Sequence, residues 1–365
     1  MRILFIASSE SIHSHKWISY FTNKGHDIIW YSMTNVNSPK NFAGKFFANS
    51  KGAGFLYFLY CFFCARRIVK TYQPDIVHAH SAGHYGLLAS LLPHRELVIT
   101  VWGSDIILNT KKFLYRQLLR RFLPKARLIT SDSPHMFETI KKHNINIENE
   151  MLINFGVDTE QFKPSKIGRK RSTNRSISIV STRSFEPIYD IETLIYATED
   201  LLKDGYNITL YLVGTGSQHE KLSLLAKRLG IESQVLFKGR VEFAKLPELL
   251  NSMDLYVSTS KSDAGIAAST AEAMACCVPC IISDVYDNHQ WIEQGKTGFL
   301  FQVSDKDSLA SEIRKAINLD EKKMFKITEA ARKKIVQENS FSLEMNKMEA
   351  ALLRLVESQN KADQL

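Results

Sequence analysis

The sequence predicts an α/β protein made of two doubly wound domains, and three observations support this prediction. Short apolar runs alternate with longer amphipathic segments, which is the pattern of parallel strands joined by helices. The pattern stops at a polar stretch near residues 163–176 and then starts again. The chain has 365 residues, more than a single hydrophobic core usually supports.

The first domain is expected to cover residues 1–165. Its opening run turns polar at Ser8, too early for the hydrophobic region of a secretory signal, so we interpret it as the first strand. The helix expected at Lys16–Lys24 should end at Gly25, because glycine readily adopts the left-handed conformation that follows a helix. The strands expected in this domain are Ile3–Ala7, Ile28–Tyr31, Ile76–His80, Leu97–Trp102 and Leu128–Thr130.

The second domain is expected to cover residues 176–338, after a linker that begins near Phe162–Pro164 and continues as the basic run Ser165–Ser176. A third segment, residues 339–365, is expected to form a helix that crosses back to the first domain, followed by a tail. The strands expected in the second domain are Ile177–Ser181, Thr209–Val213, Val235–Lys238, Leu255–Ser258 and Pro279–Ile282. The helices expected there start at Ile191, cover His219–Leu229 and contain Glu272.

The net charge of +9 lies entirely in the first domain, where residues 1–165 hold 20 Lys and Arg against 11 Asp and Glu. The rest of the chain holds 27 of each sign. A basic domain is compatible with nucleic acid, an anionic membrane surface or a phosphorylated substrate. No base-stacking or zinc motif accompanies the charge, which disfavours nucleic acid as the partner.

The five cysteines are expected to be reduced and inert, as in a cytoplasmic protein. Two pairs, Cys61/Cys64 and Cys277/Cys280, have the CxxC spacing of zinc or redox sites. The first pair lies inside an apolar run and the second enters a strand-like run, so burial is the better interpretation. We therefore expect no metal site and no cofactor.

A membrane-spanning helix is not expected. The most apolar stretch, Phe55–Ala65, has eleven uncharged residues, whereas a span needs roughly 20. The basic segment Lys111–Arg127 is interleaved with Phe and Leu, which leaves two interpretations. It is either a peripheral contact with an anionic membrane on its cytoplasmic face, or a helix packed on the domain with a solvated basic face.

A ligand site is expected beyond the carboxyl ends of the strands of the second domain, as in other open α/β sheets. Arg183 follows the strand Ile177–Ser181, and its planar guanidinium suits phosphate oxygens. The alternative is that Arg183 pairs with Glu186. A tight turn at Gly214–Gly216 follows the next strand.

Small residues precede Glu272 and give the strongest signal for an anion. The run Gly265, Ile266, Ala267 and Ala268 is expected to enter a helix whose free amide groups and dipole bind a diphosphate. Glu272, two turns along this helix, would accept hydrogen bonds from neutral hydroxyls. The alternative is a closely packed helix in which Glu272 caps a neighbouring segment.

Several separated motifs follow one another in a fixed order along the chain. They are Asp75–His80 (DIVHAH), Val101–Asp105 (VWGSD), Asn154–Asp158 (NFGVD) with Phe162–Pro164, Val213–Gly216, Phe237–Arg240, Glu272–Cys276 with Pro279, and Gly295–Gly298. Together they resemble one family, the retaining glycosyltransferases of family 4, over essentially the whole chain. The resemblance implies the GT-B fold, in which two Rossmann-like domains flank an interdomain cleft.

The resemblance implies a nucleotide sugar, UDP-linked, as donor on the second domain and an acceptor on the first. If the basic segment contacts a membrane, the expected acceptor is a lipid-linked saccharide at the cytoplasmic leaflet. The implied donor-binding residues are Arg183, Gly214, Gly239, Arg240, Val241, Lys261, Ala264, Gly265, Ile266, Ala267, Ala268 and Glu272. The implied acceptor-binding residues are His80, His84, Trp102 and Asp105. Catalytic roles are assigned to Arg183, Asp105 and Asp263, and no metal is implied.

The chain departs from the family pattern at three positions. Ala264 stands where the family's EX7E element has its first Glu, and Asp263 is expected to take that role. The family's phosphate-binding Lys falls near Tyr189, and Lys261 is expected to replace it. Trp102 stands where many members have His.

The implied reaction is departure of the nucleoside diphosphate and attack by an acceptor hydroxyl on the same face, with retention at the anomeric carbon. A phosphate oxygen of the leaving group takes the acceptor proton. Such an enzyme would serve the assembly of cell-surface polysaccharide or lipopolysaccharide. The main alternative is a nucleotide-sugar 2-epimerase of the same fold, which would consume the donor without an acceptor.

Overall fold

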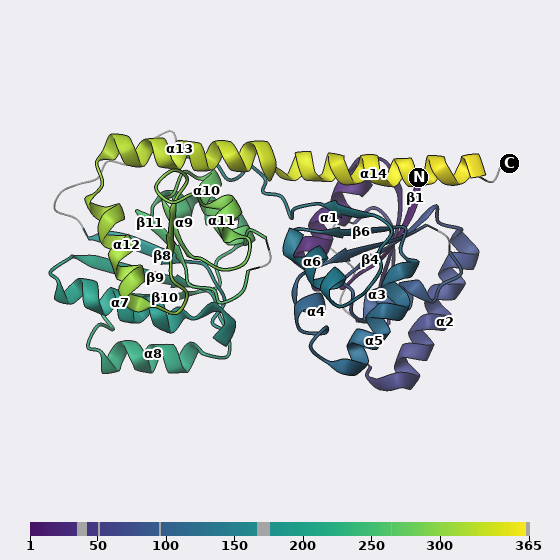
Figure 1. The fold of residues 1–365 in the computed structure, drawn as a ribbon, viewed down its shortest axis with the longest axis horizontal. Coiled ribbons are helices and arrows are strands. Elements are labelled where there is room, and N and C mark those ends of the chain that lie inside the picture. Colours follow the sequence, from purple (N-terminus) through teal and green to yellow (C-terminus); the bar gives the residue numbers. More distant parts are fainter. Residues whose placement is uncertain (35–41, 50–51, 95, 166–175, 264, 363–365) are drawn as a thin grey trace. The chain divides into compact units, whose positions relative to one another are not determined.

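The computed structural model describes residues 1–34, 42–49, 52–94, 96–165, 176–263 and 265–362. The chain divides into two compact units: the first comprises Met1–Phe155 with Glu344–Leu365, and the second comprises Gly156–Leu343 (Figure 1). Each unit contains one parallel sheet with helices packed on it. The predicted pair of doubly wound α/β domains is therefore confirmed. Most of the expected linker, residues 166–175, lies outside the described residues.

The sheet of the first unit has seven parallel strands in the order β3-β2-β1-β4-β5-β6-β7. Ile3 in the central strand β1 is aligned with Ile28 on one side and with Ile76 on the other. The inner strands are buried on both faces, which explains why they read as continuous apolar runs. The strands are β1 (Arg2–Ile6), β2 (Asp27–Ser32), β3 (Lys45–Ala48), β4 (Ile76–His80), β5 (Leu97–Val101), β6 (Leu128–Ser131) and β7 (Glu150–Leu152).

The helices of the first unit connect these strands. The first of them is capped by Ser11, whose hydroxyl accepts a hydrogen bond from Ser14 N at 3.2 Å, and it ends before Gly25, where φ is +84°, as expected. The helices are α1 (Ile12–Asn23), α2 (Gly54–Tyr72), α3 (His84–Ser90), α4 (Ser104–Ile107), α5 (Phe113–Phe122) with the 3-10 turn η1 (Leu123–Lys125), and α6 (Pro134–Lys142).

The second unit has six parallel strands in the order β10-β9-β8-β11-β12-β13. They are β8 (Ile177–Ser181), β9 (Ile208–Val213), β10 (Val235–Gly239), β11 (Leu255–Ser258), β12 (Cys280–Ser283) and β13 (Phe299–Phe301). Its helices and 3-10 turns are η2 (Pro187–Tyr189), α7 (Ile191–Lys203), α8 (His219–Arg228), η3 (Phe243–Lys245), α9 (Leu246–Asn251), α10 (Ala268–Ala275), α11 (Asn288–Trp291), α12 (Lys306–Asn318) and α13 (Glu321–Glu338).

The final helix, α14 (Phe341–Ala362), returns to the first unit, as the sequence predicted. Met345, Met348 and Leu352 on this helix are fully buried. Its carboxylate Glu349 accepts hydrogen bonds from Tyr20 Oη at 3.1 Å and from His26 Nε2 at 2.7 Å. Residues from opposite ends of the chain thus complete one hydrophobic core.

Within the described residues, no helix is both long enough and apolar enough to cross a membrane. The apolar run Phe55–Ala65 belongs to α2, where Cys61 and Ala65 face the core. All five cysteines are free thiols, and the described residues contain no cluster of His, Cys, Asp and Glu that could hold a metal ion.

Candidate functional site

Three loops of the second unit carry the predicted donor-binding residues, and each follows the carboxyl end of a strand. Arg183 follows β8, Gly214 follows β9, and the segment 259–267 leads from β11 into α10. The backbone amide of Gly214 donates to Gly239 O at 2.9 Å, which joins the loops after β9 and β10. The exposed Arg240 and the half-buried Val241 come directly after this contact.

Gly214 and Gly216 lie so close to the backbone of the loop after β8 that neither position can hold a side chain. A Cβ on Gly214 would lie 2.8 Å from Arg183 O, and a Cβ on Gly216 would lie 2.5 Å from Phe185 O. Both distances are below any that a real side chain tolerates. These glycines therefore fix the loop that carries Arg183.

Arg183 is the most strongly held cation of this region. Its Nη2 lies 2.6 Å from Asp263 Oδ1, and its guanidinium carbon lies 4.2 Å from the centroid of the Tyr189 ring. Weaker contacts join Nη1 to Ser269 Oγ at 3.4 Å and Nη2 to Ser260 Oγ at 3.5 Å. Nε is buried and has no hydrogen-bond partner among the described residues. The guanidinium thus retains one unused donor.

The alternative pairing of Arg183 with Glu186 does not occur. Glu186 instead accepts hydrogen bonds from Ser217 N at 2.9 Å and from Ser217 Oγ at 2.5 Å. These bonds lower the pKa of the Glu186 carboxyl. Arg183 takes its carboxylate partner from the loop after β11, next to the predicted anion site.

The helix α10 begins at Ala268, and Ala267 before it has the non-helical angles φ −59° and ψ 133°. Ala267 has no side-chain oxygen, so no side-chain cap closes the first amide groups of the helix. Ser269 in the first turn accepts a hydrogen bond from Tyr256 Oη at 2.8 Å. Burial raises the pKa of Tyr256, which keeps this hydroxyl protonated as a donor. Gly265 precedes the helix at φ +65°, and Ala264 lies outside the described residues.

Glu272 is the fifth residue of α10, so it lies just over one turn from the helix start. The predicted position, two turns along the helix, is wrong because α10 starts later in the chain than the small residues suggested. Its neighbours Ala271, Ala273 and Ala275 are fully buried, and α10 packs against α13. The small side chains inside the helix therefore serve close packing. Those at 265–268 lie instead beyond the carboxyl end of β11.

Lys261 is engaged with a carboxylate. Its Nζ lies 3.1 Å from Asp190 Oδ1, and Asp190 Oδ2 accepts hydrogen bonds from Thr193 Oγ1 at 2.9 Å and Ser304 Oγ at 2.7 Å. The charge that was expected to replace the family's lysine is thus balanced by Asp190. Binding of a phosphate by Lys261 remains a prediction.

In the first unit, Asp105 links the loop after β4 to the loop after β5 through hydrogen bonds. Its Oδ2 accepts a hydrogen bond from Ala82 N at 2.6 Å, and its Oδ1 accepts one from Trp102 N at 2.9 Å. Burial raises the pKa of Asp105. The structure shows a positioning role for this carboxylate, and the catalytic role remains a prediction.

His80 is buried at the end of β4, whereas His84 is exposed at the start of α3. His80 Nδ1 lies 3.0 Å from Ser14 Oγ, and its Nε2 has no hydrogen-bond partner among the described residues. Burial lowers the pKa of His80 well below its usual range. It lowers the pKa of the neighbouring His78 to about 3. Both imidazoles are therefore neutral near pH 7.

Trp102 belongs to an aromatic cluster that the sequence analysis did not identify. Its ring is stacked on Phe155 with centroids 4.8 Å apart and an angle of 15° between the planes. His13 lies 4.1 Å from the Phe155 ring and 5.8 Å from the Trp102 ring. Burial and the charge of Lys16 lower the pKa of His13 to about 4. The signal that could have revealed this cluster is Phe155, an aromatic residue inside the motif Asn154–Asp158.

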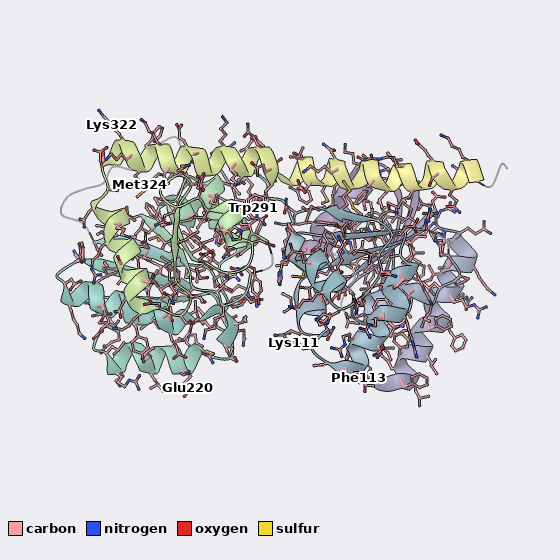
Figure 2. All side chains as sticks on the ribbon, in the orientation of Figure 1. Lys111, Phe113, Glu220, Trp291, Lys322 and Met324 are labelled. Carbon is pink, nitrogen blue, oxygen red and sulfur yellow. The ribbon has the colours of Figure 1, made fainter. Side chains whose placement is uncertain are left out.

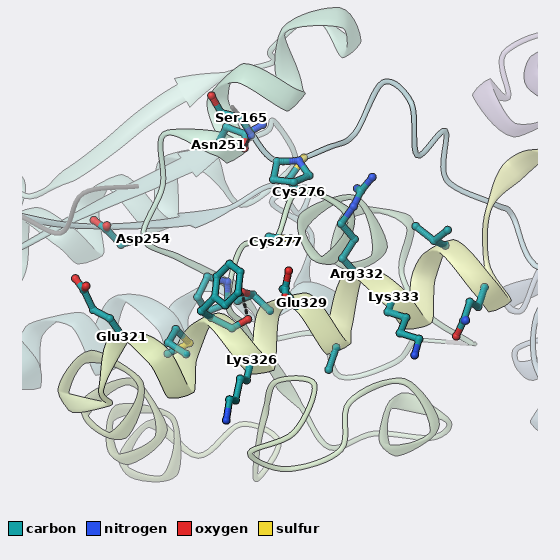
Figure 3. A pocket seen from close by; sticks show the side chains of 18 residues that line it. Ser165, Asn251, Asp254, Cys276, Cys277, Glu321, Lys326, Glu329, Arg332 and Lys333 are labelled. Atoms are coloured by element: carbon teal, nitrogen blue, oxygen red, sulfur yellow. Dashed lines mark hydrogen bonds between the residues drawn. The ribbon is translucent and has the colours of Figure 1, made fainter. Parts of the chain in front are cut away.

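A cavity of about 970 Å³ lies elsewhere in the second unit, between α13 and the turn after α10 (Figure 3). Cys276, Cys277, Glu329 and Arg332 are among its lining residues, and none of the predicted site residues lines it. Arg332 Nη1 donates to Phe162 O at 3.0 Å and to Ala275 O. Its charge therefore serves the local fold.

Two family models match the chain. The model of glycosyl transferases group 1 matches residues 163–334, and the model of glycosyl transferase 4-like domains matches residues 2–133. Together they extend over most of both units.

Similar proteins agree with these matches. N-acetyl-alpha-D-glucosaminyl L-malate synthase of Bacillus anthracis is 27% identical over 247 residues, which cover 65% of this chain and 64% of that protein, less than two thirds of its length. UDP-Gal:alpha-D-GlcNAc-diphosphoundecaprenol alpha-1,3-galactosyltransferase of Escherichia coli is 25% identical over 299 residues, covering 76% of this chain and 74% of that protein. The crystal structure of Anabaena HepE in complex with UDP-glucose has a TM-score of 0.79 at 20% identity and covers 97% of this chain and 100% of that chain.

The chain belongs to the glycosyltransferases that these two models describe, group 1 and 4-like, because together the models match most of it. It is a glycosyltransferase with the GT-B fold of two Rossmann-like units. The resemblance inferred from the sequence motifs is therefore confirmed.

Proposed function

We propose that this glycosyltransferase moves a sugar from a UDP-sugar to a lipid-linked saccharide in the assembly of cell-surface polysaccharide or lipopolysaccharide. A solved structure with the same fold contains UDP-glucose. A relative that matches 76% of this chain acts, according to its name, on an acceptor linked to diphosphoundecaprenol. The chain's own residues supply the rest of the argument.

The donor site is assigned to the second unit on one observation. The buried Arg183 guanidinium keeps a free Nε donor and contacts Ser269 in the first turn of the uncapped helix α10. A cation then lies beside the first turn of an uncapped helix, and this combination suits the two phosphates of a nucleoside diphosphate. Glu272 accepts the ribose hydroxyls, and the backbone of Gly239–Val241 holds the base.

The reaction breaks the bond between the anomeric carbon and the phosphate oxygen, and the electron pair leaves with the diphosphate. Arg183 and the α10 amides stabilise the charge that develops there, so no metal ion is needed. The acceptor hydroxyl attacks the same face, and its proton passes to a phosphate oxygen of the leaving group. The anomeric configuration is retained. Asp263, beside Arg183, contacts the transferred sugar in place of the family's Glu.

The acceptor site is assigned to the first unit, at the carboxyl edge of its sheet. His80 lies there at the end of β4, Trp102 directly follows β5, and Asp105 lies in α4. His84 lies at the start of α3. A neutral His80 offers its free Nε2 to a sugar hydroxyl. The enzyme works at the cytoplasmic face of the membrane, where it meets the lipid-linked acceptor as a peripheral protein.

A thermal-shift measurement with EDTA present tests the donor assignment. UDP and its cognate UDP-sugar should raise the melting temperature, because ligand at 100 times its Kd stabilises the folded state by about 2.7 kcal/mol. Arg183→Ala should abolish the shift, and Arg228→Ala, a control on the exposed end of α8, should preserve it. The proposal fails if millimolar UDP, UDP-glucose, UDP-galactose and UDP-N-acetylglucosamine all leave the wild-type transition unchanged.

A further inference from the structure

The helices α2, α3 and α5 come from a part of the first unit that is almost free of acidic residues. Residues 28–131 contain fourteen Lys and Arg but only three carboxylates. Of these three, Glu96 and Asp105 are buried, and Asp75 accepts a hydrogen bond from Arg2 N at 2.6 Å. The solvent-exposed side of these helices is therefore strongly positive.

On α2, exposed apolar side chains form a stripe along one side of the helix. Leu56, Tyr60 and Phe63 follow at spacings of four and three residues and are 80%, 57% and 61% exposed. The same stripe continues with the exposed basic residues Arg67 and Lys70. The opposite side of the helix packs on the core. This helix thus presents an apolar end and a basic end to solvent.

On α5, the same arrangement recurs. Leu114, Leu118 and Arg121 are exposed at spacings of four and three residues, and Phe113 beside them is 63% exposed. The exposed Lys111 comes just before the helix; Figure 2 labels Lys111 and Phe113 near its start. The short helix α3 contacts both α2 and α5, so the two stripes lie on helices that are joined through α3.

We call this surface the α2–α5 face. Its apolar residues are Phe55, Leu56, Tyr60, Phe63, Phe113, Leu114 and Leu118, and its basic residues are Arg66, Arg67, Lys70, Lys111, Lys112 and Arg121. Single exposed apolar residues are ordinary, but a group of large ones rimmed by charges marks an interaction surface.

The charge of the face selects its partner. A second copy of the same face would bring like charges together, which disfavours a dimer through this surface. Nucleic acid would pair with the basic residues but would leave Leu56, Phe63 and Leu114 in water. An anionic bilayer accepts both groups, since its acyl boundary takes apolar side chains and its phosphates take Lys and Arg.

We propose that the α2–α5 face docks the protein on an anionic lipid bilayer. Leu56, Tyr60 and Phe63 of α2 and Phe113 and Leu114 of α5 enter the boundary between headgroups and acyl chains, while the basic residues contact lipid phosphates. This binding needs neither donor nor acceptor. It rests on the proposed function only in that a lipid-linked acceptor would lie in the same bilayer.

Co-sedimentation of the full-length protein with vesicles tests the proposal. Binding should occur with vesicles of phosphatidylglycerol and phosphatidylcholine, should be weak with phosphatidylcholine alone, and should fall between about 0.1 M and about 0.5 M salt because screening shortens the reach of the charges. The triple variant Leu56→Ser, Tyr60→Ser and Phe63→Ser should lower the partition constant at least about tenfold. The control Leu224→Ser with Phe325→Ser, two exposed residues of the second unit, should bind like wild type.

The basic residues have a matched test. Each of Arg67→Gln, Lys70→Gln and Arg121→Gln should lower the partition constant by about fivefold. Lys322→Gln, Lys323→Gln and Lys326→Gln, which remove exposed charges from α13 of the second unit, should have little effect.

Four results would overturn the proposal. They are unchanged vesicle binding by the apolar triple variant, equal binding to neutral and anionic vesicles, a wild-type dimer that the triple variant converts to a monomer, and preferential binding of duplex DNA over anionic vesicles. The UDP-induced thermal shift, measured on the same preparations, reports the donor site separately, so the two proposals fail independently.

Discussion

Arg183 and Asp263 form a buried ion pair, with Nη2 and Oδ1 2.6 Å apart, at the predicted diphosphate site. A ligand carrying negative charge competes with Asp263 for this guanidinium. The carboxylate therefore holds Arg183 in place without ligand and opposes the charge of an incoming diphosphate.

Asp263→Asn should destabilise the protein and at the same time strengthen UDP binding. Removing one member of a buried ion pair costs roughly 3 kcal/mol of unfolding free energy, because the remaining charge stays buried. The diphosphate then supplies the missing negative charge, so the UDP-induced rise in melting temperature should exceed that of wild type. Glu186→Gln, which removes a half-buried carboxylate from the loop that carries Arg183, is the control. A smaller UDP shift in Asp263→Asn than in wild type would contradict this expectation.

Glu272→Ala should abolish the discrimination between UDP and 2′,3′-dideoxy-UDP. If Glu272 accepts the ribose hydroxyls, the wild type binds UDP about 10 to 100 times more tightly, since hydrogen bonds to a charged group contribute about 1.5–3 kcal/mol. The variant should bind both nucleotides with similar Kd by calorimetry. If the variant still prefers UDP over 2′,3′-dideoxy-UDP by the same factor as the wild type, Glu272 serves only the packing of α10.

His13 should make the protein less stable in mild acid. Burial lowers its pKa to about 4, so the unfolded state binds the proton first as pH falls below about 6.5, and stability decreases from there toward pH 4. At pH 5 the loss from this residue is about 2 kcal/mol relative to pH 7. His13→Phe keeps a ring against Phe155. Between pH 7 and pH 5, its unfolding free energy, measured with urea, should fall by about 2 kcal/mol less than that of the wild type. His289→Phe, at an exposed position, should change the pH dependence little.

Trp102→Ala should affect the acceptor side alone. Its ring lies in the first unit against Phe155, whereas the donor residues lie in the second unit. With a saccharide acceptor, the KM for that acceptor should rise about tenfold or more, because a stacked aromatic surface is lost, while the thermal shift with UDP stays at the wild-type value. Trp102→Phe should restore most of the affinity. An unchanged acceptor KM in Trp102→Ala would remove Trp102 from the acceptor site.

The sequence predicted the inner strands of both sheets because buried parallel strands are apolar along their whole length. Ile76–His80 and Leu255–Ser258 have the predicted bounds. The edge strands β3, β7 and β13 were not predicted. They have four, three and three residues, too few for a pattern, and their pairing with one neighbour depends on tertiary contacts that the local sequence does not reveal.

The candidate site could be predicted only in part. Strand order places Arg183 and the start of α10 at the same edge, and the motifs pointed to both. The partners of each charge could not be foreseen, since Asp263 and Asp190 are distant in sequence from Arg183 and Lys261, respectively. The helix start was also misplaced, because Ala267 and Ala268 have equal helix propensity and only the backbone decides between them.

The return of α14 to the first unit has a consequence for synthesis of the protein. Glu344 is fully buried and accepts a hydrogen bond from Asn154 N at 2.7 Å, so the first unit lacks part of its interior until α14 leaves the ribosome. The second unit, Gly156–Leu343, is continuous and can fold as soon as it emerges. The first unit, although its synthesis begins earlier, therefore completes its folding after the second unit has been made, and a nascent chain stalled before residue 344 would expose apolar surface to chaperones.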